Sequence, residues 1–154
     1  MTKETHERLS LDPSGTTWAM LCARVILGLM VLMPGYYKVF TLGPRGHAEQ
    51  FFLSGFEDSW IPTFLLLALG VTVPFVELLA GLLLVSGFQT RLGLLMEGFL
   101  LMMVTYGHFL RVPLFDMTVH IFPRLTLLLF VLVMPRTSDL ISVDHWLSRR
   151  RNAE

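Results

Sequence analysis

Four long runs of mostly apolar residues alternate with polar segments along the chain. They cover residues 18–40, 62–85, 91–110 and 117–134. A helix that crosses the hydrocarbon core of a bilayer needs about 20 mostly apolar residues, because each residue rises about 1.5 Å. The pattern therefore predicts an all-α fold, an integral membrane four-helix bundle formed by residues 18–134.

The polar segments between the runs predict how the helices are connected. Residues 86–90 and 111–116 are short and contain the glycine, proline and charged residues that are typical of turns. The connection at residues 41–61 is the only long one. Within it, residues 47–54 have the composition of a short amphipathic helix lying on the membrane, and a plain surface loop is the alternative.

The distribution of lysine and arginine predicts how the bundle is oriented. Cytoplasmic segments next to membrane helices are enriched in basic residues. The tails at residues 1–17 and 135–154 are therefore both predicted to be cytoplasmic, and the 41–61 connection extracytoplasmic. In this arrangement Lys3, Arg8, Arg91, Arg136, Arg149, Arg150 and Arg151 lie on the cytoplasmic side, and Lys38, Arg45 and Arg111 on the other.

Composition agrees with a membrane protein and excludes one class of partner. Hydrophobic residues make up 53% of the chain and charged residues 16%, and the mean hydropathy is +0.61. The formal net charge is zero, so the chain lacks the basic surplus of a nucleic-acid-binding domain. The predicted partner is the lipid bilayer, and no nucleic acid is expected.

Each predicted span contains an ionisable residue well inside it: Arg24, Glu77, Glu97 and Arg124. An ionised side chain at bilayer depth costs roughly 3 kcal/mol unless it is paired. The four charges sum to zero, and helix geometry places them in the cytoplasmic half, about 9–15 Å from their helix ends. We predict one buried polar cluster, with Arg24 paired to Glu77 and Arg124 to Glu97, that serves helix packing or proton and redox chemistry.

Small residues share the faces that carry these charges. Gly28 and Gly35 lie at helical spacing from Arg24, and Gly81 lies one turn from Glu77. Small residues let the backbones of membrane helices approach closely. The charged faces are therefore predicted to meet inside the bundle.

A second polar layer is expected nearer the outer surface. Its candidate members are Tyr36, Tyr37, Lys38, Tyr106, His108, Arg111 and His120, with His47 as a further candidate from the connection. Histidine can relay protons or donate a hydrogen bond to a carbonyl group, whereas tyrosine and lysine at a helix end are ordinary interfacial anchors. No close His-x-x-x-His or carboxylate spacing predicts a metal site, and the single Cys22 excludes dithiol exchange within one chain.

Two stretches of the chain resemble the DoxX family of small four-helix membrane proteins. One is ARVILGLMVLMPGYYKVF at residues 23–40, and the other is VELLAGLLLVSGFQTRLGLLMEGFLLM at residues 76–102, with its Glu, its glycine-rich run and its turn ending in Thr-Arg. The resemblance extends over residues 18–134. The residues that carry it are Arg24, Lys38, Glu77, Gly81, Gly87, Thr90 and Arg91.

The resemblance implies a membrane subunit linked to redox work, since the family includes the membrane partner in thiosulfate:quinone oxidoreduction. The resulting hypothesis is a subunit of a quinone-linked redox system in the plasma (inner) membrane of a bacterium, with quinone as a possible cofactor. His108 or His120 would contact a quinone carbonyl, and Glu77 or Glu97 would carry protons.

Two other classes of function stay open from the sequence. The chain can be a non-catalytic membrane scaffold or assembly partner, in which the charges only fix helix packing. A small-solute or proton transporter comes third, because no inverted repeat is evident. Whether the chain is an enzyme, which subunit donates electrons and whether the protein forms homo-oligomers are likewise open.

Overall fold

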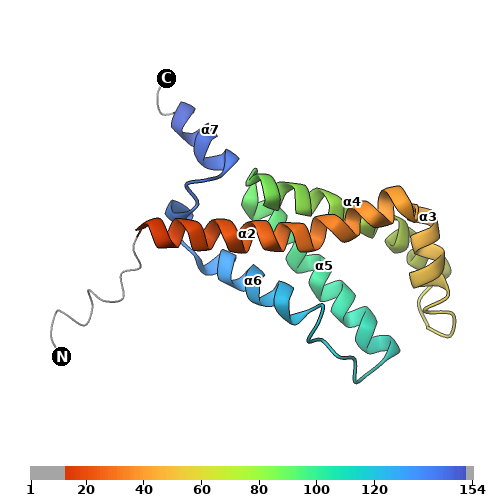
Figure 1. Ribbon diagram of the computed structural model, residues 1–154. Coiled ribbons are helices and arrows are strands. Elements are labelled where there is room, and N and C mark those ends of the chain that lie inside the picture. The colour runs from red at the N-terminus through yellow and green to blue at the C-terminus, as the bar shows by residue number, and fades with distance from the viewer. Residues whose placement is uncertain (1–12, 152–154) are drawn as a thin grey trace, which may run out of the picture.

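The computed structural model describes residues 13–151, and these residues form helices joined by turns (Figure 1). In chain order the elements are α2 (Pro13–Tyr36), η1 (Tyr37–Thr41), α3 (Pro44–His47), η2 (Ala48–Leu53), α4 (Thr63–Ser86), α5 (Thr90–Arg111), α6 (Phe122–Val133), η3 (Arg136–Ser138) and α7 (Val143–Arg151). No strand occurs within this part of the chain, so the all-α prediction is confirmed.

Three helical segments are long and apolar enough to cross a membrane: Gly15–Thr41, Thr63–Ser86 and Thr90–Arg111. The first starts before the predicted residue 18 and continues through the π-helical turn η1. The other two agree with the predicted ranges 62–85 and 91–110 to within one residue.

The fourth predicted span differs from its expected range of 117–134. Residues 117–121 form a turn, and α6 begins only at Phe122, with Pro123 in its first turn where a missing N–H is tolerated. Its 12 residues rise about 18 Å, against a hydrocarbon core of about 30 Å. A fourth full span therefore stays a prediction.

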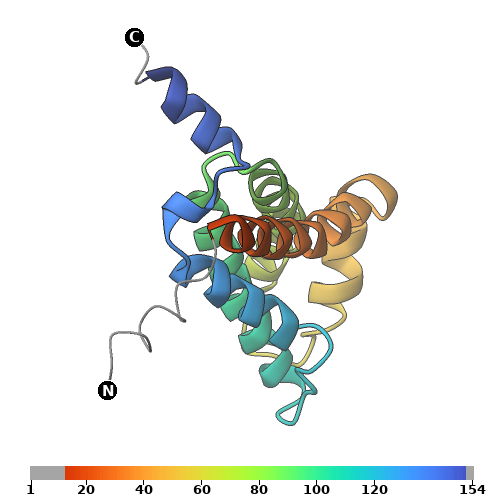
Figure 2. The same ribbon diagram turned by 60° about the vertical axis from the view of Figure 1, so that its left-hand side comes forward.

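The helices α2 and α4 run antiparallel in close contact and form the centre of the fold (Figures 1 and 2). Glycines make this approach possible. A Cβ added at Gly81 would lie 2.5 Å from the Cα of Leu32, and one at Gly35 would lie 2.6 Å from the backbone nitrogen of Leu78. The predicted small-residue interface is thus present, and it brings the backbones of the two helices together.

The remaining elements pack around this pair. The helix α6 lies against α2, and α5 contacts α4 and α6. The predicted helix in the connection is present as α3 followed by η2, and it packs on α4, where Ala48 is buried against Gly70. Buried core side chains come from all four long elements and include Leu27, Val31, Leu84, Leu94, Leu101 and Leu128.

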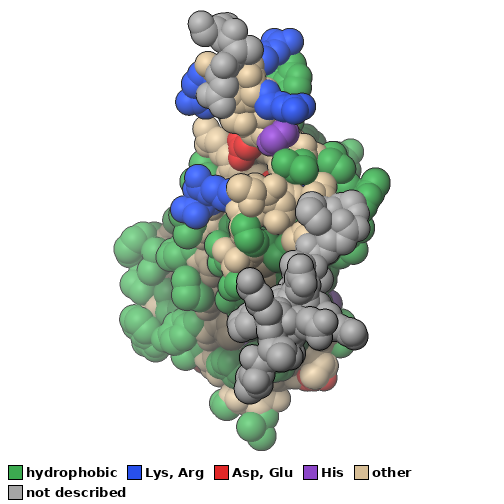
Figure 3. Space-filling view, turned by 90° about the vertical axis from the view of Figure 1, so that its left-hand side faces the viewer, with side chains coloured by type: hydrophobic (Ala, Val, Ile, Leu, Met, Phe, Trp, Pro, Cys, Tyr) green, Lys and Arg blue, Asp and Glu red, His purple; other side chains and the backbone are tan. Residues whose placement is uncertain are grey.

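Many large apolar side chains are exposed on the bundle, and hydrophobic side chains gather on the left-hand side of the view in Figure 3. Large side chains such as Met33, Phe75 and Phe99 are exposed on it. A soluble monomer rarely exposes so extensive an apolar surface, whereas helices in a bilayer face hydrocarbon. The surface therefore agrees with a bundle embedded in lipid.

The start of α2, the α4–α5 turn and α7 all lie at one end of the bundle, here named the α7 end (Figure 1). The opposite end, named the α3 end, carries η1, α3 and the end of α5. The basic residues that the structure describes divide between the ends as the sequence predicts. Lys3 and Arg8, and most of the predicted tail at residues 1–17, lie outside the described residues.

Candidate functional site

The charged residues of the predicted cluster make three sets of contacts, and Glu97 in the third set lies within electrostatic range of Glu77 and Lys38 in the first. The first is an ion pair between Lys38 and Glu77, in which the ammonium nitrogen Nζ lies 2.8 Å from Oε1 and 2.7 Å from Oε2 of the carboxylate. Glu77 projects from the middle of α4, with 4% of its side chain exposed, and Lys38 comes from η1, with 24% exposed. This pair joins the two central helices near the α3 end.

The predicted pairing of Arg24 with Glu77 is therefore wrong, and the antiparallel register explains why. Gly28 faces Val85 and Gly35 faces Leu78, so Glu77 lies opposite about residue 36 of α2. From there Arg24 is about 18 Å away along the helix axis. The predicted pairing assumes that the helices end at the same depth in the membrane, whereas α2 extends well beyond the end of α4.

A buried histidine lies beside the Lys38–Glu77 pair. His47 in α3 is 3% exposed, and its Nδ1 is 2.7 Å from the backbone oxygen of Gly70. Burial lowers the pKa of His47 below its ordinary value, and the Gly70 contact opposes this shift. The imidazole is thus neutral at pH 7, and its Nδ1–H donates to the carbonyl group. His47 holds α3 on α4 next to the pair.

Arg24 forms the second polar site, at the α7 end, where 1% of its side chain is exposed. Its Nη1 donates to the backbone oxygens of Leu84 and Val85, two carbonyls at the end of α4. Its Nη2 donates to the oxygen of Ile141 at 2.8 Å, and its Nε lies 3.4 Å from Oδ1 of Asp139. Arg24 therefore ties the C-terminal segment to the end of α4.

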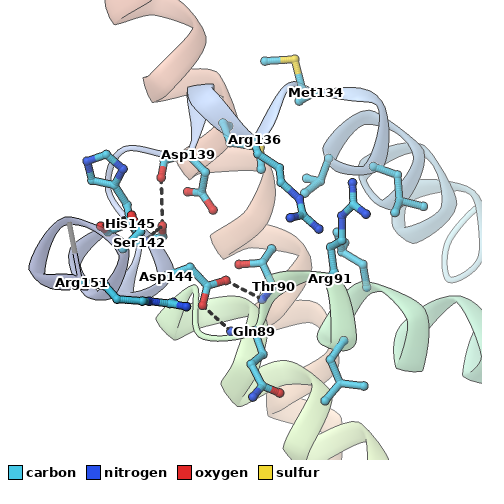
Figure 4. A pocket seen from close by; sticks show the side chains of 16 residues that line it. Gln89, Thr90, Arg91, Met134, Arg136, Asp139, Ser142, Asp144, His145 and Arg151 are labelled. Carbon is cyan, nitrogen blue, oxygen red and sulfur yellow. Dashed lines mark hydrogen bonds between the residues drawn. The ribbon is translucent and has the colours of Figure 1, made fainter.

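The turn after α4 receives the same C-terminal segment. Gly87 has a positive φ of 67°, and a Cβ there would lie 2.7 Å from the Arg24 guanidinium. Asp144 accepts hydrogen bonds from the backbone N–H groups of Gln89 at 2.8 Å and Thr90 at 3.0 Å, as Figure 4 shows. Its carboxylate thus caps α5. The contacts of Asp144 and Asp139 are structural ones that the sequence did not predict.

We expect Arg24→Lys to release the C-terminal segment while the central helices stay packed. A lysine ammonium lacks the guanidinium fork that reaches two carbonyls of α4 and that of Ile141. Hydrogen exchange at the Asp144 amide, which donates to the Gly87 oxygen, should accelerate by about tenfold, as for a local loss of about 1–2 kcal/mol. The control Arg45→Lys changes an exposed pair with Glu49, and equal acceleration in both variants would contradict the assignment.

The third site is the contact between Glu97 and Arg124, a pairing that the sequence predicted and the structure confirms. The Nη1 of Arg124 lies 3.9 Å from Oε1 of Glu97, whose side chain is 0% exposed. The Nη2 of Arg124 donates to the backbone oxygen of Met30 at 2.8 Å. Neither carboxylate oxygen of Glu97 has a hydrogen-bond partner among residues 13–151. Glu97 is the buried charge whose hydrogen-bonding capacity is left unused.

The predicted outer layer assembles only in part, with Arg111 and His120 within electrostatic range of His108. Tyr106 and His120 are exposed, and the His108 ring stacks on Phe115 with centroids 4.0 Å apart. Lys38 instead belongs to the pair with Glu77. Within the described part of the chain, no hydrogen bond involves a ring nitrogen of His108 or His120, so these nitrogens are available to a ligand.

The family-motif residues have structural roles in the contact between helices and in the turn after α4. Gly81 allows the close approach of α4 to α2, and Gly87 makes room for the Arg24 guanidinium. The backbone of Thr90 is capped by Asp144, and Arg91 is exposed at the start of α5. The motif thus marks the α2–α4 contact and the place where the C-terminal segment docks.

Comparison with known proteins identifies the family of this chain. The family model for DoxX matches residues 19–110, which include α4 and most of α2 and α5. Neither the curated proteins nor the solved structures contain a match. The matched range covers more than half of the chain and contains Arg24, Lys38, Glu77 and the motif glycines. The chain is a member of the DoxX family of membrane proteins.

Proposed function

We propose that this protein is a membrane subunit of a quinone-linked redox system in a bacterial plasma membrane, with its α7 end in the cytoplasm and Glu97 as the group that carries protons. The observation that carries the proposal is the state of Glu97. Its carboxylate is fully buried and makes no hydrogen bond to the residues described, although a guanidinium lies 3.9 Å away.

The other two buried charges, Arg24 and Glu77, each make hydrogen bonds that hold the bundle together. Arg24 donates to three carbonyl groups, and Glu77 receives Lys38 on both oxygens. A buried carboxylate without such partners is costly for packing alone. Such a carboxylate can gain or lose a proton when the charge nearby changes, because no fixed hydrogen-bond donor holds it in one protonation state.

The residues at the α3 end fit a quinone headgroup. A quinone supplies two-electron, two-proton chemistry and presents carbonyl oxygens as hydrogen-bond acceptors. His108 is partly exposed, and its ring is held in place by its stack on Phe115, so that a ring N–H can donate a hydrogen bond to a carbonyl group. His120 lies in the turn just before α6. These two histidines would hold the headgroup. Glu97 lies about 16 Å from His108 along α5, so it serves a separate role.

Photolabelling with an azidoquinone tests the proposed site. We expect labelling of the peptide around residues 106–120 that excess quinone suppresses, and we expect the His108→Ala, His120→Ala double variant to lose it. The control double variant Arg149→Gln, Arg150→Gln should label normally. Labelling that ignores excess quinone and persists in the histidine variant would exclude the site.

The role of Glu97 has an independent readout. Infrared difference spectra recorded on reduction of bound quinone are expected to contain a carboxyl band that Glu97→Gln removes. Glu49→Gln, which changes an exposed carboxylate in η2, should leave the band in place. If the band persists in Glu97→Gln, a group other than Glu97 takes up the proton on reduction of the quinone.

A scaffold without chemistry is the second candidate, and one observation favours it. Arg24 and Asp144 fix the C-terminal segment to the bundle, so that the arginine-rich α7 projects from its end (Figure 1). A scaffold predicts that Glu97→Gln, in a stably folded protein, leaves function intact, whereas the redox proposal predicts its loss. A scaffold also predicts no quinone-protected labelling.

A further inference from the structure

A cavity of roughly 530 Å³ lies at the α7 end, between the start of α5, the end of α6 and α7 (Figure 4). Its walls combine two kinds of surface. One part is apolar and is formed by Met20, Leu92, Leu94, Val131, Leu132 and Met134, and the other is polar and carries the side chains of Arg91, Arg136 and Arg151. The cavity is thus apolar toward the bundle and basic toward its end.

The two carboxylates that line the cavity are already engaged. Asp139 lies 3.4 Å from the buried Arg24, and both oxygens of Asp144 accept backbone N–H groups at the start of α5. The side chains of Arg91, Arg136 and Arg151 form no ion pair or hydrogen bond with the residues that the structure describes. Three exposed guanidinium groups therefore line one cavity, and none of them is paired with a carboxylate of the described residues.

A buried hydroxyl group also faces this space. The Thr90 side chain lines the cavity, yet the residue is only 8% exposed and its Oγ1 has no hydrogen-bond partner among residues 13–151. In Figure 4 it lies between Asp144 and Arg91, at the start of α5. Asp144 already caps the start of α5, and the Thr90 hydroxyl is a further donor that no residue among 13–151 uses.

We propose that this cavity binds the phosphate group of an anionic phospholipid, with its acyl chains along the apolar wall. Guanidinium groups bind phosphate through paired N–H donors, and the basic residues lie where the apolar bundle surface ends, at the level of lipid headgroups. Leu92 and Leu132 are each 45% exposed beside the cavity, which gives acyl chains a continuous apolar path. A free phosphate would share the same polar contacts but not this path.

Native mass spectrometry of the full chain in detergent tests the site with phosphatidylglycerol, phosphatidylcholine and inorganic phosphate as probes. We expect phosphatidylglycerol to bind more tightly than phosphatidylcholine. Arg91→Gln with Arg136→Gln should weaken phosphatidylglycerol binding roughly 25-fold, at about fivefold per basic residue near a lipid headgroup. Thr90→Val is expected to weaken it by a smaller factor.

The double variant Arg149→Gln, Arg150→Gln is the matched control, because it removes two charges from α7 that do not line the cavity. It should retain wild-type affinity. If millimolar inorganic phosphate displaces the lipid, the natural ligand of the cavity is a soluble phosphate. If it does not, the ligand is the phospholipid. Equal weakening in both double variants, or equal affinity for the two lipids, would overturn the proposal.

Discussion

Lys38→Met is expected to lower the free energy of unfolding by about 3–5 kcal/mol, because it strands the Glu77 carboxylate, which is 4% exposed, inside the bundle. The double variant Lys38→Met, Glu77→Leu should recover most of this loss, since apolar residues can replace a buried ion pair at little cost. Glu77→Leu alone should cost less than Lys38→Met, because the Lys38 side chain is 24% exposed and can extend its ammonium toward water.

Unfolding in mixed micelles of increasing dodecyl sulfate content measures these differences as a double-mutant cycle. The exposed pair Arg45 and Glu49 supplies the control, since its side chains are 86% and 56% exposed and such a pair contributes at most about 1 kcal/mol. Additive losses for Lys38 and Glu77, without recovery in the double variant, would show that the two side chains do not stabilise each other.

Gly81→Ala carries the second large effect, an expected loss of about 1–3 kcal/mol from overpacking. The added Cβ would meet the Cα of Leu32 at 2.5 Å and its Cβ and nitrogen at 2.6 Å. Because two of these three atoms belong to the backbone, the clash is relieved only if α2 and α4 move apart. The same unfolding assay measures the loss.

Gly98→Ala is a matched control on α5. Its added Cβ would meet only the end of the Leu128 side chain, at an ordinary 3.5 Å, and alanine favours a helix over glycine by about 1 kcal/mol. We expect it to be neutral or stabilising. Equal losses in Gly81→Ala and Gly98→Ala would mean that the close contact between α2 and α4 does not determine stability.

The sequence predicted the helical class and the interface between the first two long helices, because both depend on local pattern. Apolar length gives the spans, and glycine at helical spacing gives the close contact. It also predicted the pairing of Arg124 with Glu97, which the structure confirms. The start of α6 was missed, because hydropathy does not distinguish the turn at residues 117–121 from a helix.

The partner of Glu77 was missed because it depends on the register between α2 and α4, which composition does not specify. Lys38 was assigned to the outer layer as an interfacial residue, yet its long side chain reaches back to Glu77 from η1. The role of Arg24 was missed because its acceptors are backbone oxygens and a tail aspartate, Asp139. No sequence pattern marks such contacts.

Solid-state NMR in lipid bilayers measures the central ion pair directly. The chain has two lysines, Lys3 and Lys38, so Lys3→Arg leaves Lys38 as the only site for a ¹⁵Nζ label, and glutamate is labelled with ¹³C at the carboxyl group. We expect a strong Nζ-to-carboxyl coupling that Glu77→Gln abolishes and Glu97→Gln leaves intact. Absence of that coupling, or coupling of the Glu77 carboxyl to the Arg24 guanidinium, would contradict the pairing of Lys38 with Glu77.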